Sequence, residues 1–476
     1  MDLDALLLSR LQFAFTIAFH IIFPSFTIGL ASFLAVLEGL WLATRREAFK
    51  TLYLFWVKIF ALSFGMGVVS GVVMSYQLGT NWSVFSTIVS PVIGPLLAFE
   101  VLTAFFLEAS FLGVMLFGWR KVGPRLHFTA TVTVAVGTLI SAFWIISANS
   151  WMQHPAGFGR MPDGTLRALD WMSVIFSPTF PERFAHMVLA AYLTTALVVG
   201  AASAWRLLRQ PQETESRLAL RMAVGMFAIV APLQLVVGDL SGKEVLQVQP
   251  AKLAAIEAFW ETRTEQPFHI AAWPDRAAEK NQWEISIPKI GSWITAGESA
   301  AEIKGLKAFA PEDRPPVALV FWAFRVMVGL GLAMIALGAW GAWLILRGRR
   351  PGRGPEAVRP FLWACVAMGP AGFVAVIAGW IVAEVGRQPY VVYGVLRTAD
   401  AVSPVGAGSV SASLLAFLVV YAVVFSVGAL YILRLIAAGP LPPGAADTEP
   451  PIKPRPPGYA LGAAPDPAAH EEEARR

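Results

Sequence analysis

The sequence is poor in the residues that usually cover the surface of soluble proteins. Charged residues make up 14% of the 476 positions and hydrophobic residues 56%, whereas soluble domains carry about 25% charged residues. Cysteine occurs once, as Cys365, which excludes an internal disulfide, an all-cysteine iron–sulfur cluster and a Cys-x-x-Cys-His haem attachment. This composition indicates a surface that largely faces lipid rather than water.

Long apolar runs account for most of the chain. A membrane-spanning helix needs about 20 predominantly apolar residues in a row, and nine such stretches are present. We therefore expect an all-α, polytopic membrane protein built from bundles of nine transmembrane helices. The predicted spans are residues 11–42, 51–75, 92–118, 127–148, 184–205, 219–238, 317–346, 361–385 and 409–435.

Basic residues gather in the short loops after the first, third, fifth and seventh spans, for example Arg45, Arg120, Arg206 and Arg347. The loop at residues 77–91 has neither lysine nor arginine. Because basic short loops stay in the cytoplasm, the pattern predicts a multi-pass membrane protein with its N-terminus outside and its C-terminus inside. Topology also accounts for the net charge of +5 without a nucleic-acid partner.

Two segments stand apart from the spans. Residues 239–316 form one long external loop of mixed charge with four tryptophans, and loops of this length are usually functional or disordered. Residues 439–476 are rich in proline and alanine, which predicts a disordered cytoplasmic tail. The predicted organisation is helices one to six in residues 1–238, the external loop in 239–316, helices seven to nine in 317–438, and the tail.

Ionisable side chains inside the spans need a reason, because charge in hydrocarbon is costly. Several of them fall in the outer part of the membrane when depth is counted at about 1.5 Å per residue. They are His20, His186, Arg325 and Glu384, joined by Met327 as a soft ligand. Four different helices contribute to this outer layer, which favours a shared site.

Each candidate also has a plain structural interpretation. A lone histidine can pack between helices, a methionine such as Met327 often fills gaps, Arg325 could extend to the interface and Glu384 could be an interfacial carboxylate. The combination of these residues in one layer favours a site that binds haem iron. A His–Met pair makes a six-coordinate, low-spin haem, as His186 and Met327 could, whereas a single ligand leaves iron open to oxygen, as His20 or Glu384 would.

Glu100 and Glu108 lie eight residues apart on the third predicted span. Two steps of four residues keep them roughly on one face of a helix, about 12 Å apart along its axis. Paired carboxylates on one stripe are typical of a proton relay; the alternative is that they hydrogen-bond neighbouring helices. With this orientation, Glu108 is the more cytoplasmic of the two.

The histidine count excludes two other redox classes. A haem–copper oxidase needs six imidazoles, and a bis-histidine cytochrome b needs four on two helices, but at most three histidines here lie within or at the edge of spans. The six are His20, His127, His154, His186, His269 and His470. A haem-free secondary transporter with the buried carboxylates as coupling sites stays open as an alternative, although no inverted repeat supports it.

Eight motifs resemble subunit I of cytochrome bd-type quinol oxidases, and they occur in the family's order over nearly the whole chain before the tail. They are SRLQFAFTIAFH (9–20), GTNWS (79–83), FFLEASFLG (105–113), NSWMQHP (149–155), GDLSG (238–242), KLAAIEAFWET (252–262), FWAFRVMVG (321–329) and GWIVAEVGRQPY (379–390). Each is weak alone; together they are specific.

The resemblance implies three haems. It makes His186 and Met327 the iron ligands of a low-spin haem b, and His20 and Glu384 iron ligands of two high-spin haems, one of haem b and one of haem d or a further haem b. It also implies that Arg325 and Arg387 lie near the haems and could bind propionates; for Arg387 the alternative is a simple outer-loop charge.

The resemblance further implies a catalytic role for four residues. Glu100 and Glu108 match carboxylates that line the high-spin site and its proton path, and Lys252 and Glu257 match residues of the loop that binds ubiquinol or menaquinol. A second large membrane subunit, and small single-span subunits, are implied as partners. The short external loop, with Tyr390 where tryptophan is frequent, is similar to the cyanide-insensitive branch, some members of which use only b-type haems.

Overall fold

The computed structural model describes residues 4–348 and 354–440. Within these ranges nine helices are long and apolar enough to cross a membrane, which confirms the predicted number of spans. The described β-structure consists of three two-stranded antiparallel sheets in the connections between helices. The tail predicted from residue 439 lies outside the described residues, apart from Gly439 and Pro440.

The helices are longer than the apolar runs that predicted them. The first two helices are α1 (Ala5–Thr44) and α2 (Glu47–Thr80), and the third crossing is α3 (Ser83–Glu100), a π-helical turn η1 (Val101–Phe105) and α4 (Phe106–Phe117). The chain continues through α5 (Pro124–Gln153), β1 (Phe158–Arg160), β2 (Leu166–Ala168), α6 (Trp171–Ile175), α7 (Phe180–Arg209) and α8 (Thr214–Val248).

The long external connection has its own small elements. They are α9 (Pro250–Glu257), β3 (Phe268–Asp275), β4 (Lys280–Ile287), α10 (Ile290–Ala296) and the 3-10 turns η2 (Leu306–Ala308) and η3 (Pro311–Asp313). The last elements are α11 (Val317–Arg347), η4 (Pro355–Ala357), α12 (Arg359–Met368), α13 (Ala371–Val385), β5 (Tyr390–Val392), β6 (Leu396–Arg397) and α14 (Ala407–Ala438).

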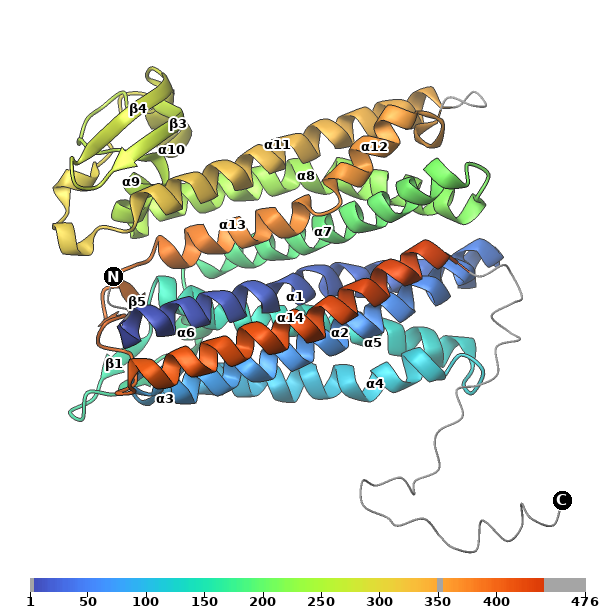
Figure 1. Cartoon of the computed structure of the whole chain (residues 1–476), viewed down its shortest axis with the longest axis horizontal. Coiled ribbons are helices and arrows are strands. Elements are labelled where there is room, and N and C mark those ends of the chain that lie inside the picture. Colours follow the sequence, from blue (N-terminus) through green and yellow to red (C-terminus); the bar gives the residue numbers. More distant parts are fainter. Residues whose placement is uncertain (1–3, 349–353, 441–476) are drawn as a thin grey trace, which may run out of the picture. The chain divides into compact units, whose positions relative to one another are not determined.

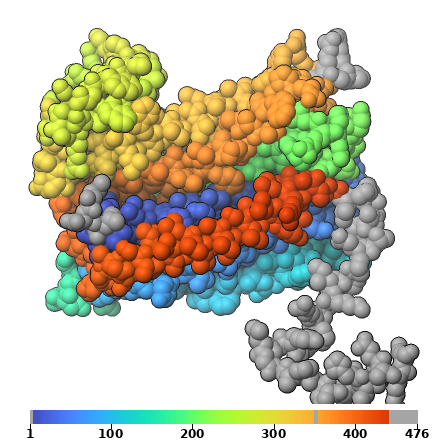
Figure 2. All heavy atoms as spheres, viewed as in Figure 1, coloured from blue at the N-terminus to red at the C-terminus, as the bar shows by residue number. Residues whose placement is uncertain are grey.

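The spanning helices form two groups that pack along α1 and α7. Figure 1 shows α7, α8, α11, α12 and α13 in one group, and α1, α2, α3, α4, α5 and α14 in the other. One hydrophobic core, including Leu30, Leu34, Leu197 and Phe227, runs through both groups. In Figure 2 the atoms of α14 cover one face of the second group, and its valines and leucines are largely exposed.

Two boundaries differ from the sequence prediction. The connection expected at residues 77–91 is reduced to Asn81 and Trp82, because α3 begins at Ser83 and carries Pro91 and Pro95 inside the helix. Proline is tolerated in membrane helices where neighbours satisfy the backbone. Likewise α8 continues ten residues beyond the predicted end of its span, to Val248, so the polar stretch after Gly238 is helical rather than loop.

Candidate functional site

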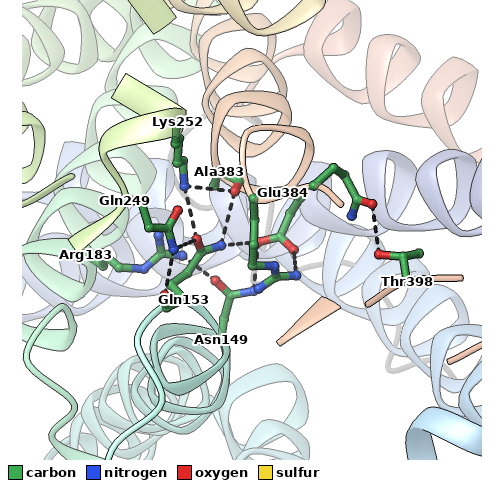
Figure 3. A network of polar contacts seen from close by, with 10 residues as sticks. Asn149, Gln153, Arg183, Gln249, Lys252, Ala383, Glu384 and Thr398 are labelled. Atoms are coloured by element: carbon green, nitrogen blue, oxygen red, sulfur yellow. Dashed lines mark hydrogen bonds and ion pairs between the residues drawn. The ribbon is translucent and has the colours of Figure 1, made fainter. Parts of the chain in front are cut away.

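A cluster of polar side chains lies at one end of the helix groups, where α5, α7, α9 and α13 meet (Figure 3). We call it the outer polar cluster, and its members are Asn149, Gln153, Arg183, Gln249, Lys252, Glu384 and Arg387. At its centre, Glu384 Oε1 accepts hydrogen bonds from Asn149 Nδ2 (3.0 Å) and Gln153 Nε2 (3.1 Å), and Glu384 Oε2 is ion-paired with Arg387. The sequence placed Glu384 and Arg387 three residues apart at a helix end, and the structure pairs them.

Lys252 joins this cluster from the external loop. Its Nζ donates to Gln153 Oε1 (3.0 Å) and to the carbonyl of Ala383 (3.0 Å), and the residue is only 3% exposed. Burial is the main cause that lowers the pKa of Lys252 well below its ordinary value; Arg183 lowers it further, whereas Glu384 raises it. The loop is therefore anchored in the cluster by a desolvated amine.

The outer polar cluster has more cationic groups than anionic ones. Arg183, Lys252 and Arg387 face the single carboxylate of Glu384 within it, and Glu244 is close enough to affect Lys252. Arg387 Nε and Nη1 are buried without a hydrogen-bond partner among the described residues. Unpaired buried guanidinium groups are costly, so the cluster is suited to additional anionic groups such as carboxylates.

Glu257 lies on the other side of α9 and is paired with Arg325 of α11. Arg325 Nη2 donates to Glu257 Oε2 at 2.7 Å, and Arg325 Nε donates to the carbonyl of His269 at 2.8 Å. Glu257 is 3% exposed. The structure thus brings together two residues that the sequence assigned to different roles, one to quinol and one to a haem. Arg325 Nη1 keeps no partner among the described atoms.

The short helix α9 explains why Lys252 and Glu257 diverge. Its first turn contains Pro250, whose ring fixes φ for a helix start, and it ends at Ala258 in the left-handed conformation (φ 54°). All of its residues from Ala251 to Glu257 are buried. A five-residue separation turns the two side chains away from each other, Lys252 toward α5 and α13 and Glu257 toward α11.

Three of the four predicted iron ligands face a glycine on a neighbouring helix. A Cβ added at Gly71 would lie 3.2 Å from His20 Cε1, at Gly238 3.3 Å from His186 Cε1, and at Gly379 3.0 Å from Met327 Sδ. Each glycine therefore lets the side chain of a predicted ligand approach the neighbouring helix more closely than any other residue would allow. This pattern was not part of the sequence prediction.

The polar atoms of these residues also fit iron ligation. His186 Nε2 lies 3.1 Å from the amide nitrogen of Gln234, and its Nδ1 is buried without a partner. His20 Nδ1 lies 2.9 Å from Ser70 Oγ, which leaves Nε2 available. A carboxylate offers about four lone-pair sites, so Glu384 retains capacity beyond its three contacts. No two of the four predicted ligands are hydrogen-bonded to each other in the described ranges.

Glu100 and Glu108 both face α5. Ser141 Oγ donates to Glu100 Oε1 at 2.8 Å, and a Cβ at Gly137 would lie 2.7 Å from Glu108 Cγ. Eight residues make about 2.2 turns of a regular α-helix, which would leave Glu108 about 80° round the helix from Glu100. The π-helical turn at Val101–Phe105 takes up the surplus, because each of its turns holds more residues.

Sequence reasoning missed several buried polar residues. Asn149 and Gln153 donate to Glu384, and Arg183 donates to Asn149 Oδ1. Gln249 Nε2 donates to the Gln153 carbonyl at 2.6 Å. The motif NSWMQHP contains Asn149 and Gln153. The sequence therefore placed these two residues in a family motif but did not predict their contacts. Arg183 was missed because it directly precedes the predicted span 184–205, and a charged residue in a loop needs no special explanation.

A second buried pair was also missed. His127 Nδ1 lies 2.7 Å from Glu38 Oε1, and both side chains are almost fully buried. Thr131 Oγ1 donates to Glu38 Oε2 at 2.6 Å, and Tyr53 lies 2.9 Å from the same hydroxyl. The pair ties α1, α2 and α5 together at the end opposite the outer polar cluster.

Comparison with known proteins covers nearly all described residues. The family model described as cytochrome bd terminal oxidase subunit I matches residues 8–440. The chain belongs to this family. Membership in the cytochrome bd family confirms the resemblance seen in the motifs and does not favour the transporter alternative.

Relatives of the cytochrome bd family cover almost the whole chain. Cytochrome bd ubiquinol oxidase subunit 1 of Bacillus subtilis is 34% identical over 92% of this chain and 94% of its own length. Cytochrome bd-II ubiquinol oxidase subunit 1 of Escherichia coli is 32% identical over 94% and 99%. The solved structure of bd oxidase from Geobacillus thermodenitrificans is 30% identical, with a TM-score of 0.85 over 92% of this chain and all of that one.

Proposed function

We propose that this chain is the subunit of a membrane-bound bd-type oxidase that oxidises quinol and reduces oxygen to water. The observation that carries the proposal is the family match over residues 8–440, together with buried Lys252 and Glu257 on one helix of the external loop. Two relatives are named as ubiquinol oxidases and one, of Bacillus subtilis, as a putative menaquinol oxidase. The enzyme class is a quinol:oxygen oxidoreductase of the bacterial inner membrane.

The quinol is proposed to bind at α9. The Glu257 carboxylate accepts a proton from one quinol hydroxyl, and Arg325 holds that carboxylate in place through its 2.7 Å contact. Lys252 lies on the opposite side of α9, where its amine donates hydrogen bonds toward Gln153 and α13. Because its side chain points away from Glu257, Lys252 would hold the quinol-binding helix α9 in position rather than contact the same quinol molecule.

Three haems are proposed, and when bound they carry electrons singly and supply the iron at which oxygen is reduced. His186 and Met327 would hold a low-spin haem b; His20 and Glu384 would hold two high-spin haems, a haem b and a haem d or further haem b. The buried Nδ1 of His186, which has no hydrogen-bond partner among the described residues, supports this assignment. Arg387 and Arg325 each have unpaired guanidinium nitrogens suited to propionates.

Protons for water formation are proposed to come from the cytoplasm by way of Glu108 and then Glu100. Both carboxylates face α5, at Gly137 and Ser141, so a proton passed between them stays along one helix. Release of quinol protons outside and consumption of protons from inside separates charge across the membrane without a pump. Moving one charge against 100 mV stores about 2.3 kcal/mol.

The predicted partners are a second large membrane subunit and small single-span subunits. The largely apolar, exposed surface of α14 is compatible with either lipid or such a subunit, so the complete complex is the proper object of experiment.

The proposal is tested by purifying the complex and recording its reduced-minus-oxidised spectrum with a pyridine haemochrome analysis. We expect b-type haem bands, and oxygen uptake that starts on addition of quinol. A colourless protein that takes up no oxygen would contradict the oxidase proposal and favour the haem-free transporter.

A further inference from the structure

The hairpin formed by β3 and β4 carries an apolar face that no other part of the described chain covers. This hairpin face consists of Ile270, Trp273, Trp283, Ile285 and Ile287, all exposed, with Trp273 at 53% and Ile285 at 59%. Such a patch on a water-facing domain marks an interaction surface. The hairpin face is therefore expected to contact something outside the described chain, and the position of the hairpin indicates what that is.

Contacts with α11 fix the depth of the hairpin. The base of the hairpin lies beside Arg325, because Arg325 Nε donates to the His269 carbonyl at 2.8 Å and its guanidinium lies 4.9 Å from the Phe268 ring. The tip lies further out, because Arg276 donates to the Pro311 carbonyl and Arg314 pairs with Glu279. The hairpin thus runs alongside the outer turns of α11 (Figure 1).

The length of α11 places Arg325 at the outer boundary of the hydrocarbon. The stretch from Arg325 to Arg347 measures about 33 Å at about 1.5 Å per residue, and the hydrocarbon core of a bilayer is about 30 Å thick. Arg347 lies over the Trp343 ring at the other end of α11, an arrangement suited to the opposite interface. The hairpin base therefore lies at headgroup depth rather than above the membrane.

Polarity changes along the hairpin in the same direction as it does across a membrane interface. Nearest the base are the three isoleucines, Ile270, Ile285 and Ile287, and the next position outward holds Trp273 and Trp283. The tip carries only charged and small residues, Asp275, Arg276, Ala277, Ala278, Glu279 and Lys280. Tryptophan prefers the headgroup level, with aliphatic residues below it and charge above it.

The strand pairing is adapted to this face. The register shifts beside Ile270 and again between Ala272 and Pro274, which is beside Trp273, and such irregularities bend a strand and redirect its side chains. On the inner side, His269 contacts the Glu257 carbonyl (2.8 Å) and Glu284 (3.2 Å). One side of the hairpin thus closes over Glu257 while the other faces outward.

We propose that the hairpin face inserts into the outer leaflet of the membrane and so anchors the external loop at the lipid boundary. On α11, Leu319 and Val326 lie seven residues apart on one helix face and are also exposed, so they add apolar surface beside the hairpin. In Figure 2 this region stands out at the flank of α11, beside the bundle rather than only on its end. A lipid-soluble substrate would then reach Glu257 laterally, without crossing water.

Spin labels on the intact complex in phospholipid vesicles test this proposal. Ile285→Cys, Trp283→Cys and Lys280→Cys place a nitroxide at the base, middle and tip of one strand, and the unsubstituted protein is the control because its one cysteine, Cys365, is buried. We expect relaxation of the Ile285 label by oxygen to exceed relaxation by a water-soluble nickel chelate severalfold, with the reverse at Lys280.

Two other outcomes would overturn the proposal. An Ile285 label relaxed mainly by the nickel chelate would place the hairpin in water. An Ile285 label immobilised and protected from both reagents would mean that a protein subunit covers the face. Haem bands and quinol-driven oxygen uptake of each variant, compared with the unsubstituted complex, show that the labelled protein is folded.

Discussion

Glu257 and Lys252 lie on the same short helix but in different electrostatic surroundings. Glu257 is held by one cation, Arg325, at 2.7 Å. Lys252 is surrounded by neutral acceptors and by further cations, with Glu384 as the main counter-charge in the outer polar cluster. The two residues are therefore expected to respond differently when their charge is removed.

Glu257→Gln is expected to lower quinol-driven oxygen uptake by about 100-fold, in the range of a lost general base. An artificial donor that reduces the haems directly should still support uptake close to that of the wild type, because glutamine keeps an oxygen that can accept from Arg325. The exposed Glu261, paired with Lys307, gives a matched control as Glu261→Gln. Equal loss with both donors would count against a role in quinol oxidation.

Lys252→Met is expected to remove a pH dependence of stability. Because burial lowers the pKa of Lys252 in the folded protein, the unfolded chain binds more protons between that lowered pKa and about 10.4, its ordinary value. Wild-type stability should therefore rise with pH across this window, and the variant should lack that increase. Thermal unfolding of the complex at neutral and alkaline pH measures it.

The control for this experiment is Lys289→Met, which alters an exposed lysine paired with Glu265. If Lys252→Met and wild type show the same slope of melting temperature against pH, the desolvated amine does not contribute to the pH dependence of stability.

At the residue scale, the sequence identified the chemical groups but not their partners. His20, His186, Glu384 and Arg325 were predictable because ionisable residues in apolar runs are rare. Their contacts were not, because Glu257 and Arg325 are 68 positions apart and only tertiary packing joins them. Gln153 and Asn149 gave no signal by themselves, since neutral amides are common and their value here comes from geometry.

The glycines beside the proposed ligands make a prediction about helix spacing. Gly379→Ala would place a Cβ 3.0 Å from Met327 Sδ, so the thioether must shift. We expect a shifted or weakened low-spin haem b band in the reduced-minus-oxidised spectrum, as for Met327→Leu. Gly329→Ala is the control, since nothing lies within 4 Å of its added Cβ; identical spectra for both alanine variants would remove Met327 as a ligand.

A second prediction concerns the contact between Glu108 on α4 and Gly137 on α5. Gly137→Ala would place a Cβ 2.7 Å from Glu108 Cγ and displace the carboxylate from α5. We expect slower turnover and slower proton uptake from the cytoplasmic side while the haem spectrum is retained. Gly113→Ala on α4 meets nothing within 4 Å and should behave as wild type. Wild-type turnover in Gly137→Ala would exclude Glu108 from the proton path.

At the scale of elements, helix ends could be predicted where apolarity alone sets them. The prediction of helix ends was wrong where polar residues continue a helix. The nine spans follow from composition and are confirmed. The extension of α8 to Val248 was missed because its last turns are polar. The third predicted span began at residue 92, whereas α3 begins at Ser83. The π-helical turn at Val101–Phe105 has no composition signal, since it depends on packing against α5.

For the whole molecule, the proposed reaction uses residues from both helix groups, since His20 lies on α1 and Glu384 on α13. The His186 and Met327 helices, α7 and α11, belong to one group, and the Glu100 and Glu108 segments belong to the other (Figure 1). The outer polar cluster lies where α5 of one group meets α7, α9 and α13. The charge pattern of the loops, rather than the fold, predicts which end is outside.

This arrangement predicts the proton balance of the enzyme in sealed vesicles. Quinol oxidation yields two protons with two electrons, so outside release should equal one proton per electron, with equal consumption inside. A pH indicator outside the vesicles measures the protons released there, and an oxygen electrode measures oxygen uptake and hence the number of electrons transferred. A ratio clearly above one would require a pump, and no net release would place quinol oxidation and proton uptake on the same side.

The amide of Gln153 has a consequence for how substrate and iron communicate. Its Oε1 accepts from Lys252 and its Nε2 donates to Glu384, so one side chain touches both Lys252 of the proposed quinol-binding helix and the proposed ligand. An amide cannot turn to satisfy one neighbour without disturbing the other. Occupancy of the substrate pocket and affinity for the metal at Glu384 should therefore be thermodynamically linked, each altering the other by the same factor.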